Sequence, residues 1–586
     1  MARTPSVTIE VIKSAAAEAL LADPLFVAAW RQLCASCPWV TTFQGPDFVV
    51  TWYRAYRAKF GPVLVMARSA MGELQGLLTL AESLGDRRLA VAGAWQAEYH
   101  VWVCLPELAE EFPLAAFAAV GDQLQSSGLH FTYLPPRTPL RWLENSSSSR
   151  RFVLTPHRRP LMQLGDGSDV ANSLKKPGNK SRLKRLGKSD VVAFKRIDDP
   201  IELGRLFDDL VAIYDTRRMA LDGSGPFQND PFKRRFHLDM AAIPGLLHST
   251  VLMAGPHLVA AHLGIPTGRE LQLGLIAHNP LFANHSPGKF QLLFLAQLLQ
   301  KEGFQQLDLT AGGDPYKERF ANTWDEVHRL TVFPSRLSAA RGRTRSVVAS
   351  AARRQLAQLK IAPARAEALA HRLLSLPTRE GVHTVRSAAR SGGAWLASSS
   401  ANHVFAKSAI DLSERAKGAC VGAEVLTLHG RVHHNHIGDL LAYAPASTGQ
   451  TAQQFIAESL GRLEAGLHLY TLVEHRRLVC WAWLANPATP QLLAQVLPEY
   501  ECPPNAAVLF DLHTSPETRD RDNILSVLGT MLCDVRQSEN CEHVRLAVSA
   551  TEAVSIQAAE ALGLVRSATI TRTTRFGRTS SFVLHT

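Results

Sequence analysis

The fold of this chain is decided by residues Asn284 to Phe333, NHSPGKFQLLFLAQLLQKEGFQQLDLTAGGDPYKERFANTWDEVHRLTVF. Ser286 suits an N-cap and Pro287 a first helical turn, and apolar residues with helical spacing follow them. Gly303 suits the end of that helix. FQQLDL then alternates as a strand does, and DPYKERFA restarts a helix after two glycines. The stretch predicts helix, strand, short helix and strand in that order.

The first turn of the long helix has the composition of an anion site. A helix N-terminus presents unpaired N–H groups and the positive end of the helix dipole. Gly288 lets a ligand approach the backbone closely, and Lys289 adds a positive charge. We therefore expect Ser286, Pro287, Gly288 and Lys289 to form a cradle for a phosphate-like group.

Length and composition indicate a multidomain protein of the reducing cytoplasm. At 586 residues the chain is too long for one core, and 46% hydrophobic with 20% charged residues is ordinary for a globular protein. No apolar run is long enough to span a bilayer, and the N-terminus lacks the apolar core of a signal peptide. The eight cysteines are scattered, and the one C-x-x-C pair, Cys34 and Cys37, has no second pair to complete a zinc site.

The net charge of +11 is concentrated in one segment. Residues 336–395 contain twelve Lys or Arg and two acids, so the remainder is close to neutral. A sequence-specific nucleic-acid binder would carry basic residues over its folded domains as well, so we expect no such partner. Amphipathic helices in residues 336–400 act either as a solvated linker or as a peripheral contact with the inner face of a membrane.

The order of elements before the cradle narrows the fold class. A basic helix, SLKKPGNKSRLKRL from Ser173, is followed by helical residues 201–243 and then by three apolar strands that lead into the opening stretch. The GNAT acyltransferase fold has this order of elements: helices, three strands, helix, strand, helix and strand. In that fold the pyrophosphate of coenzyme A lies on the helix N-terminus after the fourth strand.

Four motifs make the resemblance more specific. They are FQGPDFVVTW from Phe43, SLKKPGNKSRLKRL from Ser173, HSPGKFQLLFLAQLL from His285 and LDLTAGGDPYKERFA from Leu307. Together they resemble the acyltransferase-like domain of CelD-type cellulose and exopolysaccharide biosynthesis proteins, a branch related to FemAB-type transferases. The resemblance covers residues 25–335 and implies a degenerate GNAT-like half packed against a complete GNAT domain.

The expected architecture is α/β (α+β), with tandem GNAT-like domains built on mixed central sheets flanked by helices. We expect a degenerate GNAT-like half in residues 1–150, the acyltransferase core in 151–335, a basic helical linker in 336–405 and a degenerate GNAT-like domain in 406–586. In the last domain the usual acyl-CoA loop is replaced by RDRDNI from Arg519, and Ala559 stands where a tyrosine is common. We expect this copy to be non-catalytic and to hold the acceptor or build a homodimer interface.

The resemblance implies direct attack of an amine or hydroxyl on a thioester, which needs a base, an acid and a donor for the carbonyl oxygen. We expect Tyr316 to be the acid, Asp308 or His262 the base, and a backbone N–H near Leu275 the carbonyl donor. The remaining candidates are Lys317 for phosphate and Glu98, His100 and Arg319 for the acceptor. The structural alternatives are a packing tyrosine, a loop-holding aspartate and a core histidine.

A histidine-rich segment, LHGRVHHNHIG, contains His429, His433, His434 and His436. No cysteine or carboxylate completes a recognisable ligand spacing, and on a strand His433 and His436 would face opposite sides. We therefore interpret it as a polar strand or loop and expect no metal.

These features predict an acyl-CoA-dependent N- or O-acyltransferase with a small-molecule, glycan or lipid-linked acceptor in polysaccharide or envelope assembly. The first alternative is a FemAB-like transferase that uses aminoacyl-tRNA, with which the basic helix is compatible. The second is a non-catalytic scaffold of a synthase complex. The absence of G-x-S-x-G, Walker, H-E-x-x-H and strand-linked G-x-G-x-x-G motifs argues against hydrolase, NTPase, zinc protease and Rossmann alternatives.

Overall fold

The computed structural model describes most of the chain outside the basic segment. The described residues are 8–143, 149–165, 168–188, 190–312, 314–342, 344, 397–408, 432–445, 450–487, 496, 498–503, 505–515, 520–537, 541–575 and 578–585. The amphipathic helices expected in the linker fall largely outside these residues, so the linker and its membrane contact stay predictions. Where the chain is described, no helix is both long and apolar enough to cross a bilayer.

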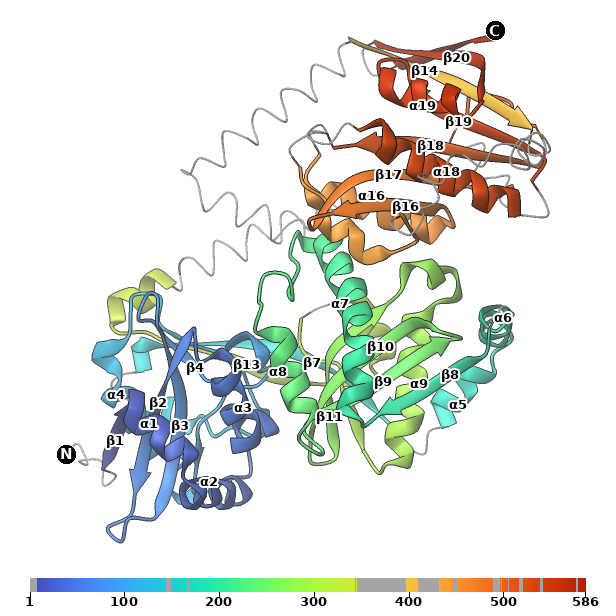
Figure 1. Ribbon diagram of the computed structural model, residues 1–586. Helices are drawn as coiled ribbons and strands as arrows, with labels where there is room; N and C mark the ends of the chain where they lie inside the picture. Colours follow the sequence, from blue (N-terminus) through green and yellow to red (C-terminus); the bar gives the residue numbers. More distant parts are fainter. Residues whose placement is uncertain are drawn as a thin grey trace. The chain divides into compact units, whose positions relative to one another are not determined.

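The chain divides into two compact units. The first comprises Met1–Leu210, Phe227–His278 and His285–Lys360, and the second comprises Val211–Pro226, Asn279–Asn284 and Ile361–Thr586. The first unit contains two sheets and the second contains one (Figure 1).

The first sheet is antiparallel, with strand order β1-β2-β3-β4 and with β5 also paired to β3. Its strands are β1 (Ile9–Lys13), β2 (Phe60–Arg68), β3 (Leu74–Ser83), β4 (Leu89–Val91) and β5 (Val103–Cys104). The helices around it are α1 (Ser14–Ala22), α2 (Pro24–Ser36), α3 (Pro46–Tyr56) and α4 (Glu111–Ala119), with 3-10 turns η1 (Thr42–Gln44), η2 (Ala94–Gln96), η3 (Pro106–Leu108), η4 (Gly121–Gln123), η5 (Arg141–Leu143) and η6 (Ser149–Arg151). Fully buried aromatic side chains such as Trp30, Trp52 and Trp102 fill the core of this region.

The second sheet has eight strands in the order β6-β13-β7-β12-β11-β10-β9-β8. They are β6 (Leu129–Leu134), β7 (Phe152–Gln163), β8 (Val192–Ile197), β9 (His248–Ala254), β10 (His257–Thr267), β11 (Glu270–His278), β12 (Gln306–Asp308) and β13 (Thr323–Val332). The pair β11 and β12 is parallel, and the other described pairs of this sheet are antiparallel.

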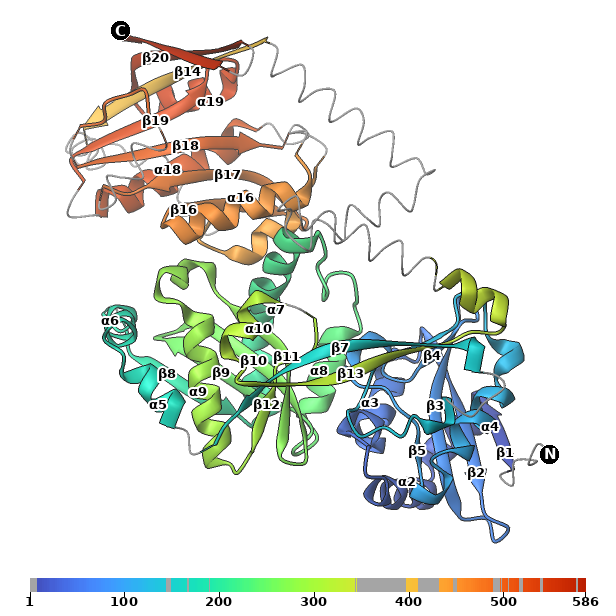
Figure 2. The same ribbon diagram turned by 180° about the vertical axis from the view of Figure 1, so that it is seen from behind.

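Helices cover both faces of the second sheet. They are α5 (Ser168–Lys175), α6 (Pro177–Leu186), α7 (Pro200–Asp222), α8 (Lys233–Ala241), α9 (Pro287–Lys301) and α10 (Pro315–Phe320), and the 3-10 turn η7 (Pro280–His285) precedes α9 in the chain. Figure 1 shows α7 and α8 in front of this sheet, and the reverse view in Figure 2 shows α9 and α10 on its other face. The predicted helix, strand, short helix and strand correspond to α9, β12, α10 and β13. Ser286 and Asp314 occupy the two N-cap positions, but neither side chain makes a cap hydrogen bond.

The third sheet has the order β15-β16-β17-β18-β19-β14-β20-β21. Its strands are β14 (Ala397–Ser408), β15 (Val432–His434), β16 (His468–Glu474), β17 (Arg477–Ala485), β18 (Ala506–Thr514), β19 (His543–Ser549), β20 (Val565–Arg575) and β21 (Arg578–His585). The accompanying helices are η9 (Ile437–Ala442), α16 (Ala452–Ala465), α18 (Arg521–Gln537) and α19 (Ala553–Ala561), and the side chains of α18 and α19 help fill the core of this sheet.

The second and third sheets repeat one topology. From β13 the second sheet runs β13-β7-β12-β11-β10-β9-β8, and from β20 the third runs β20-β14-β19-β18-β17-β16-β15. In each seven-strand series the strand that comes first in the chain, β7 or β14, pairs with the later member of the parallel pair, and one long helix, α9 or α18, connects that pair. The fold is therefore α/β with two mixed sheets of the same design, as the sequence predicted. The four predicted domains stay a prediction, although β6 and β14 join sheets across the expected boundaries at 150 and 405.

Candidate active site

The parallel pair β11 and β12 opens after three residues. Glu270, Leu271 and Gln272 pair with residues 306–308, and the chain then leaves the sheet at Thr310, whose φ is +63°. Within the described residues, β11 from Leu273 onward has no strand partner on this side. Such an edge offers backbone N–H and C=O groups to an extended ligand. Leu275, predicted to lie at the thioester, is on this edge.

The neighbouring strand β10 is bent by a bulge that requires two glycines. The register of β10 against β11 shifts between Leu263 and Ile265. A Cβ on Gly264 would lie 2.5 Å from the Gln272 carbonyl oxygen, and a Cβ on Gly274 would lie 2.5 Å from the Leu263 carbonyl oxygen. Any side chain at either position would push the strands apart, so both glycines fix the shape of the open edge.

The open edge of β11 precedes the N-terminus of α9 in the chain, where the predicted cradle lies. Ser286 has a φ of +56°, and its carbonyl accepts the N–H groups of Lys289 and Phe290. The Gly288 N–H has no acceptor among the described residues and is available to an anion. A Cβ on Gly288 would lie 3.2 Å from Nδ1 of His278, so a small residue suits this position.

The basic helix α6 lies beside this cradle. Lys289 Nζ donates to Asn179 Oδ1 over 2.9 Å, and the buried Asn179 donates in turn to the Ser173 carbonyl over 2.6 Å. The pKa of Lys289 is lowered by burial and by the positive charges of Arg182 and Lys176. The Lys289 ammonium in the cradle therefore lies near two further cations, a setting that favours an anionic ligand.

A buried charge cluster lies at the end of β12, centred on Arg159 of β7. Arg159 Nη1 lies 3.2 Å from Asp308 Oδ2 and 3.1 Å from Glu270 Oε1, and its Nε and Nη2 bind Asp325 over 2.7 and 2.6 Å. The Arg159 side chain is 4% exposed and that of Asp308 is 0% exposed. The Tyr99 hydroxyl also donates to Asp308. One guanidinium thus binds three carboxylates, and its loss would leave the fully buried Asp308 without a positive partner.

Asp308 is placed as a structural anchor and not as an accessible base. Its second oxygen accepts the Thr310 N–H over 2.7 Å, which fixes the turn after β12. Burial raises the pKa of Asp308, while the positive charge of Arg159 opposes that change. Both oxygens are occupied, so the prediction that Asp308 takes the acceptor proton does not fit this geometry.

Glu98 is the acid beside this cluster that remains reachable. It is partly exposed on the loop before Tyr99. Burial and the negative charge of Asp308 raise the pKa of Glu98 to about 7, against the charges of Lys317 and Arg329. A carboxyl that titrates near neutral pH is suited to take a proton. The sequence placed Glu98 among the acceptor contacts, and its surroundings suit it better to the role of base.

The two histidine candidates are core residues. His262 on β10 is 0% exposed, and neither of its ring nitrogens has a hydrogen-bond partner in the described part of the chain. Burial lowers its pKa well below the usual value, and the nearby His248 adds to this effect. His100 is also buried, accepts the Thr132 N–H at Nδ1 over 3.1 Å, and has a pKa lowered by burial to about 4. A base must be reachable by the acceptor, so His262 does not fit the predicted role, and His100 does not fit an acceptor contact.

The residues of α10 have mixed placements. Tyr316 is partly buried, and Arg319 is exposed. The Lys317 ammonium points back to its own loop, with Oγ1 of Thr310 at 2.9 Å and Oδ2 of Asp314 at 3.2 Å. Lys317 therefore holds the turn after β12, so the prediction that it contacts a cofactor phosphate requires it to release these partners.

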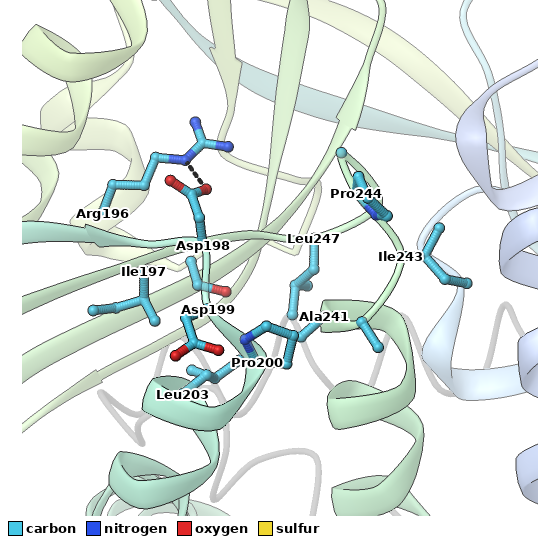
Figure 3. A pocket seen from close by; sticks show the side chains of 13 residues that line it. Arg196, Ile197, Asp198, Asp199, Pro200, Leu203, Ala241, Ile243, Pro244 and Leu247 are labelled. Carbon is cyan, nitrogen blue, oxygen red and sulfur yellow. Dashed lines mark hydrogen bonds and ion pairs between the residues drawn. The ribbon is translucent and has the colours of Figure 1, made fainter.

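A separate cavity of about 230 Å³ lies at the end of β8, between the start of α7 and the end of α8 (Figure 3). Arg196 at its rim binds Asp198 over 2.7 Å, and Asp199 caps α7 by accepting the Ile201 N–H over 2.9 Å. None of the predicted site residues lines it. Its charged groups are engaged in ion pairs and a helix cap, and none of the residues that line it comes from β11 or α9.

The second sheet, with its opened parallel pair and the helix that follows, defines an acyltransferase-type domain of the GNAT class. Residues 179–318 match the family model described as an acetyltransferase (GNAT) domain. No curated protein matches the chain.

Solved structures similar to this chain share little sequence with it. A conserved protein of unknown function from Bacteroides thetaiotaomicron has 11% identity and a TM-score of 0.36, covering 52% of this chain and 97% of that one. FemX has 9% identity and a TM-score of 0.35, covering 53% and 94%. The L-PGS of Bacillus licheniformis has 12% identity and a TM-score of 0.35, covering 54% and 94%.

Proposed function

We propose that this chain is an N- or O-acyltransferase that takes an acyl group from acyl-CoA or a similar thioester. The observation that carries the proposal is the open edge of β11 together with the anion cradle at the start of α9, in the part of the chain that matches the GNAT family. An extended thioester arm would pair with the edge, and its pyrophosphate would meet the Gly288 N–H and Lys289.

The transfer is a direct displacement with no covalent enzyme intermediate. The acceptor amine or hydroxyl attacks the thioester carbonyl and gives its proton to the Glu98 carboxylate. A backbone N–H of β11 near Leu275 stabilises the carbonyl oxygen as it becomes negative. The carbon–sulfur bond then breaks, and the leaving thiolate takes a proton from the Tyr316 hydroxyl. The Arg159 cluster positions Tyr99 and so the loop that bears Glu98.

The acceptors to test first are amino sugars, sugar hydroxyls and lipid-linked intermediates of envelope or polysaccharide assembly. The resemblance to CelD-type proteins supports this choice.

A second candidate donor is an aminoacyl-tRNA, as in the FemAB-type alternative. The observation that favours it is the basic helix α6, whose Lys176 and Arg182 lie close enough to lower the pKa of Lys289. Helix α6 also carries Lys180, Lys184 and Arg185, and a polyanion would use more of these charges than a pyrophosphate would.

The deciding experiment follows acyl transfer by the full chain to a panel of amino sugars and amines. One arm supplies acetyl-CoA and longer acyl-CoAs, and the other supplies aminoacyl-tRNA, each with and without RNase. We expect transfer from an acyl-CoA that RNase does not change. Transfer from tRNA alone, abolished by RNase, would replace the first proposal with the second. Transfer in neither arm would favour the non-catalytic scaffold.

Replacing Tyr316 by phenylalanine tests its role as the acid. We expect kcat to fall by about 100-fold, because proton donation to the thiolate acts in the transition state. The dissociation constant of the acyl-CoA should change little, since the ring remains. Tyr53→Phe is the matched control, because its hydroxyl donates to the Leu80 carbonyl inside the first sheet. An unchanged kcat in Tyr316→Phe would remove Tyr316 from this role.

A further inference from the structure

Three side chains that could bind a metal converge in the second unit, outside the site described above. His433 Nδ1 lies 2.7 Å from Asp439 Oδ2, and His436 Nδ1 lies 2.7 Å from Asp439 Oδ1. All three ligand atoms lie within 4.8 Å of one another. The two imidazoles are about half exposed, while the Asp439 carboxylate is buried beneath them. The cluster therefore has a fixed base and an open side.

One left-handed residue brings the two histidines together. His433 and His436 are three residues apart, so on a regular strand they would face opposite sides of the sheet. Strand β15 ends at His434, and Asn435 has a φ of +55°. This turn interrupts the alternation of side chains between the two faces of the strand, so His436 lies on the same side as His433. The sequence-based expectation that they point apart fails for this reason.

Hydrogen bonds hold the turn in this conformation. The Asn435 N–H donates to the Leu469 carbonyl over 2.8 Å, and the Asn435 side-chain oxygen accepts the Leu469 N–H over 2.9 Å. A positive φ at a residue other than glycine costs energy and persists only when its surroundings determine it. The bonds to β16 do so, and the two imidazoles are thereby preorganised.

The carboxylate is held as firmly as the imidazoles. Asp439 lies on η9, its N–H donates to the His436 carbonyl over 3.2 Å, and the buried Thr471 hydroxyl donates to its Oδ2 over 2.5 Å. A ligand whose orientation is fixed by a second hydrogen bond is a regular feature of metal sites. Asp439 also supplies the carboxylate that the sequence pattern lacked, three residues beyond His436.

We propose that His433, His436 and Asp439 bind one divalent transition-metal ion, with Zn²⁺ the best match. Two imidazole nitrogens and one carboxylate oxygen form a donor set typical of zinc, with a fourth position open to water or another ligand on the exposed side. Zinc bonds of about 2.0–2.2 Å hold tetrahedral ligand atoms roughly 3.3 Å apart. Of the two 2.7 Å contacts, the one that involves the ligating carboxylate oxygen would lengthen by about 0.6 Å as the ion replaces the shared proton. The ion would join β15 to η9.

The proposal is independent of the acyltransferase site, because direct displacement at a thioester needs no metal. The proposal also replaces the sequence-based expectation that the chain binds no metal. Without an ion, the same three side chains can satisfy one another by hydrogen bonds, and metal titration separates the two states.

The test uses the full, untagged chain after chelator treatment, titrated with ZnCl₂ by calorimetry and with Co²⁺ by visible absorption. We expect wild type to bind one more equivalent than His433→Gln and Asp439→Asn, and to show tetrahedral Co²⁺ bands that both variants lose. His433 is half exposed, so His433→Gln is expected to fold even if Asp439→Asn does not. Thermal unfolding without metal checks this.

The matched control is His513→Gln. His513 makes a similar 2.7 Å contact with Asp511 in the same unit but stands outside the cluster. We expect it to bind metal as wild type does. Equal binding by wild type and His433→Gln, or a loss in His513→Gln as large as in His433→Gln, would overturn the proposal.

Discussion

Replacing Arg159 by methionine is expected to destabilise the first unit by about 3–5 kcal/mol, the cost of removing one partner from a buried ion pair. The guanidinium is the shared cation of Asp308, Glu270 and Asp325, and Asp308 is fully buried. Burial already raises the pKa of Asp308 and of Glu270, and without Arg159 both would bind protons more tightly. Urea unfolding followed by tryptophan fluorescence measures the loss, which should be smaller at low pH, where the carboxyls are neutral.

The neighbouring arginine provides the control. Arg158 has an exposed side chain and a 3.8 Å contact with Glu318, so Arg158→Met should change the unfolding free energy by less than about 1 kcal/mol. Equal effects of the two variants would contradict the view that Arg159 organises the interior of the site.

Replacing Glu98 by glutamine is expected to lower kcat by about 10²–10⁴-fold, the range for losing a general base. The base must be deprotonated, so kcat/KM of the wild type should rise with pH through about 7, the value to which burial raises the pKa of Glu98. The variant should lose this dependence. Glu73→Gln, at an exposed position, is the control and should retain both the rate and the profile. A Glu98→Gln enzyme with wild-type kcat and the same pH profile would exclude Glu98 as the base.

The same variant should gain stability. The pKa of Glu98 is raised in the folded chain, so the folded state binds its proton more tightly than the unfolded state does. The stabilising contribution of the neutral carboxyl is present at low pH and is lost as pH rises through about 7. Glutamine is neutral at every pH. At pH 8 the free energy of unfolding of Glu98→Gln, measured by denaturant titration, should therefore exceed that of the wild type by at most about 3 kcal/mol. At pH 4 the two free energies should be nearly equal.

The elements around the cradle could be predicted because their signals are local. Pro287, Gly303 and Pro315 mark helix ends within a few residues, and α9, β12 and α10 follow them. The order of strands before α9 was enough to indicate the GNAT topology.

The charge cluster could not be predicted in the same way. Tyr99, Arg159 and Asp308 are separated by 60 to 209 residues and meet because β7 inserts between β12 and β13. No spacing in the sequence records that insertion. The two arginines in residues 152–163, Arg158 and Arg159, were the available signal, since a charge on a buried strand needs a partner.

The histidine candidates show a different limit. His262 and His100 have the right chemistry, but only the packing shows that they are buried among apolar neighbours. For His433 and His436 the sequence missed the proposed metal site. A regular strand would place the two side chains on opposite faces, but the positive φ of Asn435 brings them together.

Calorimetric titration of the full chain with acyl-CoA tests most directly that the β11 edge and the α9 cradle bind a thioester donor. The decisive variant is Gly288→Glu, in which a carboxylate would occupy the anion position. An acidic residue in the first turn favours the helix, but its Cβ would lie 3.2 Å from Nδ1 of His278, so that side chain must shift and far-UV circular dichroism checks that the fold is retained. We predict one acyl-CoA per wild-type chain, because Asp520 and Asp522 stand at the corresponding turn of the third sheet's helix, and no detectable binding to Gly288→Glu. No binding of any acyl-CoA to the wild type, or equal binding to both chains, would contradict the account.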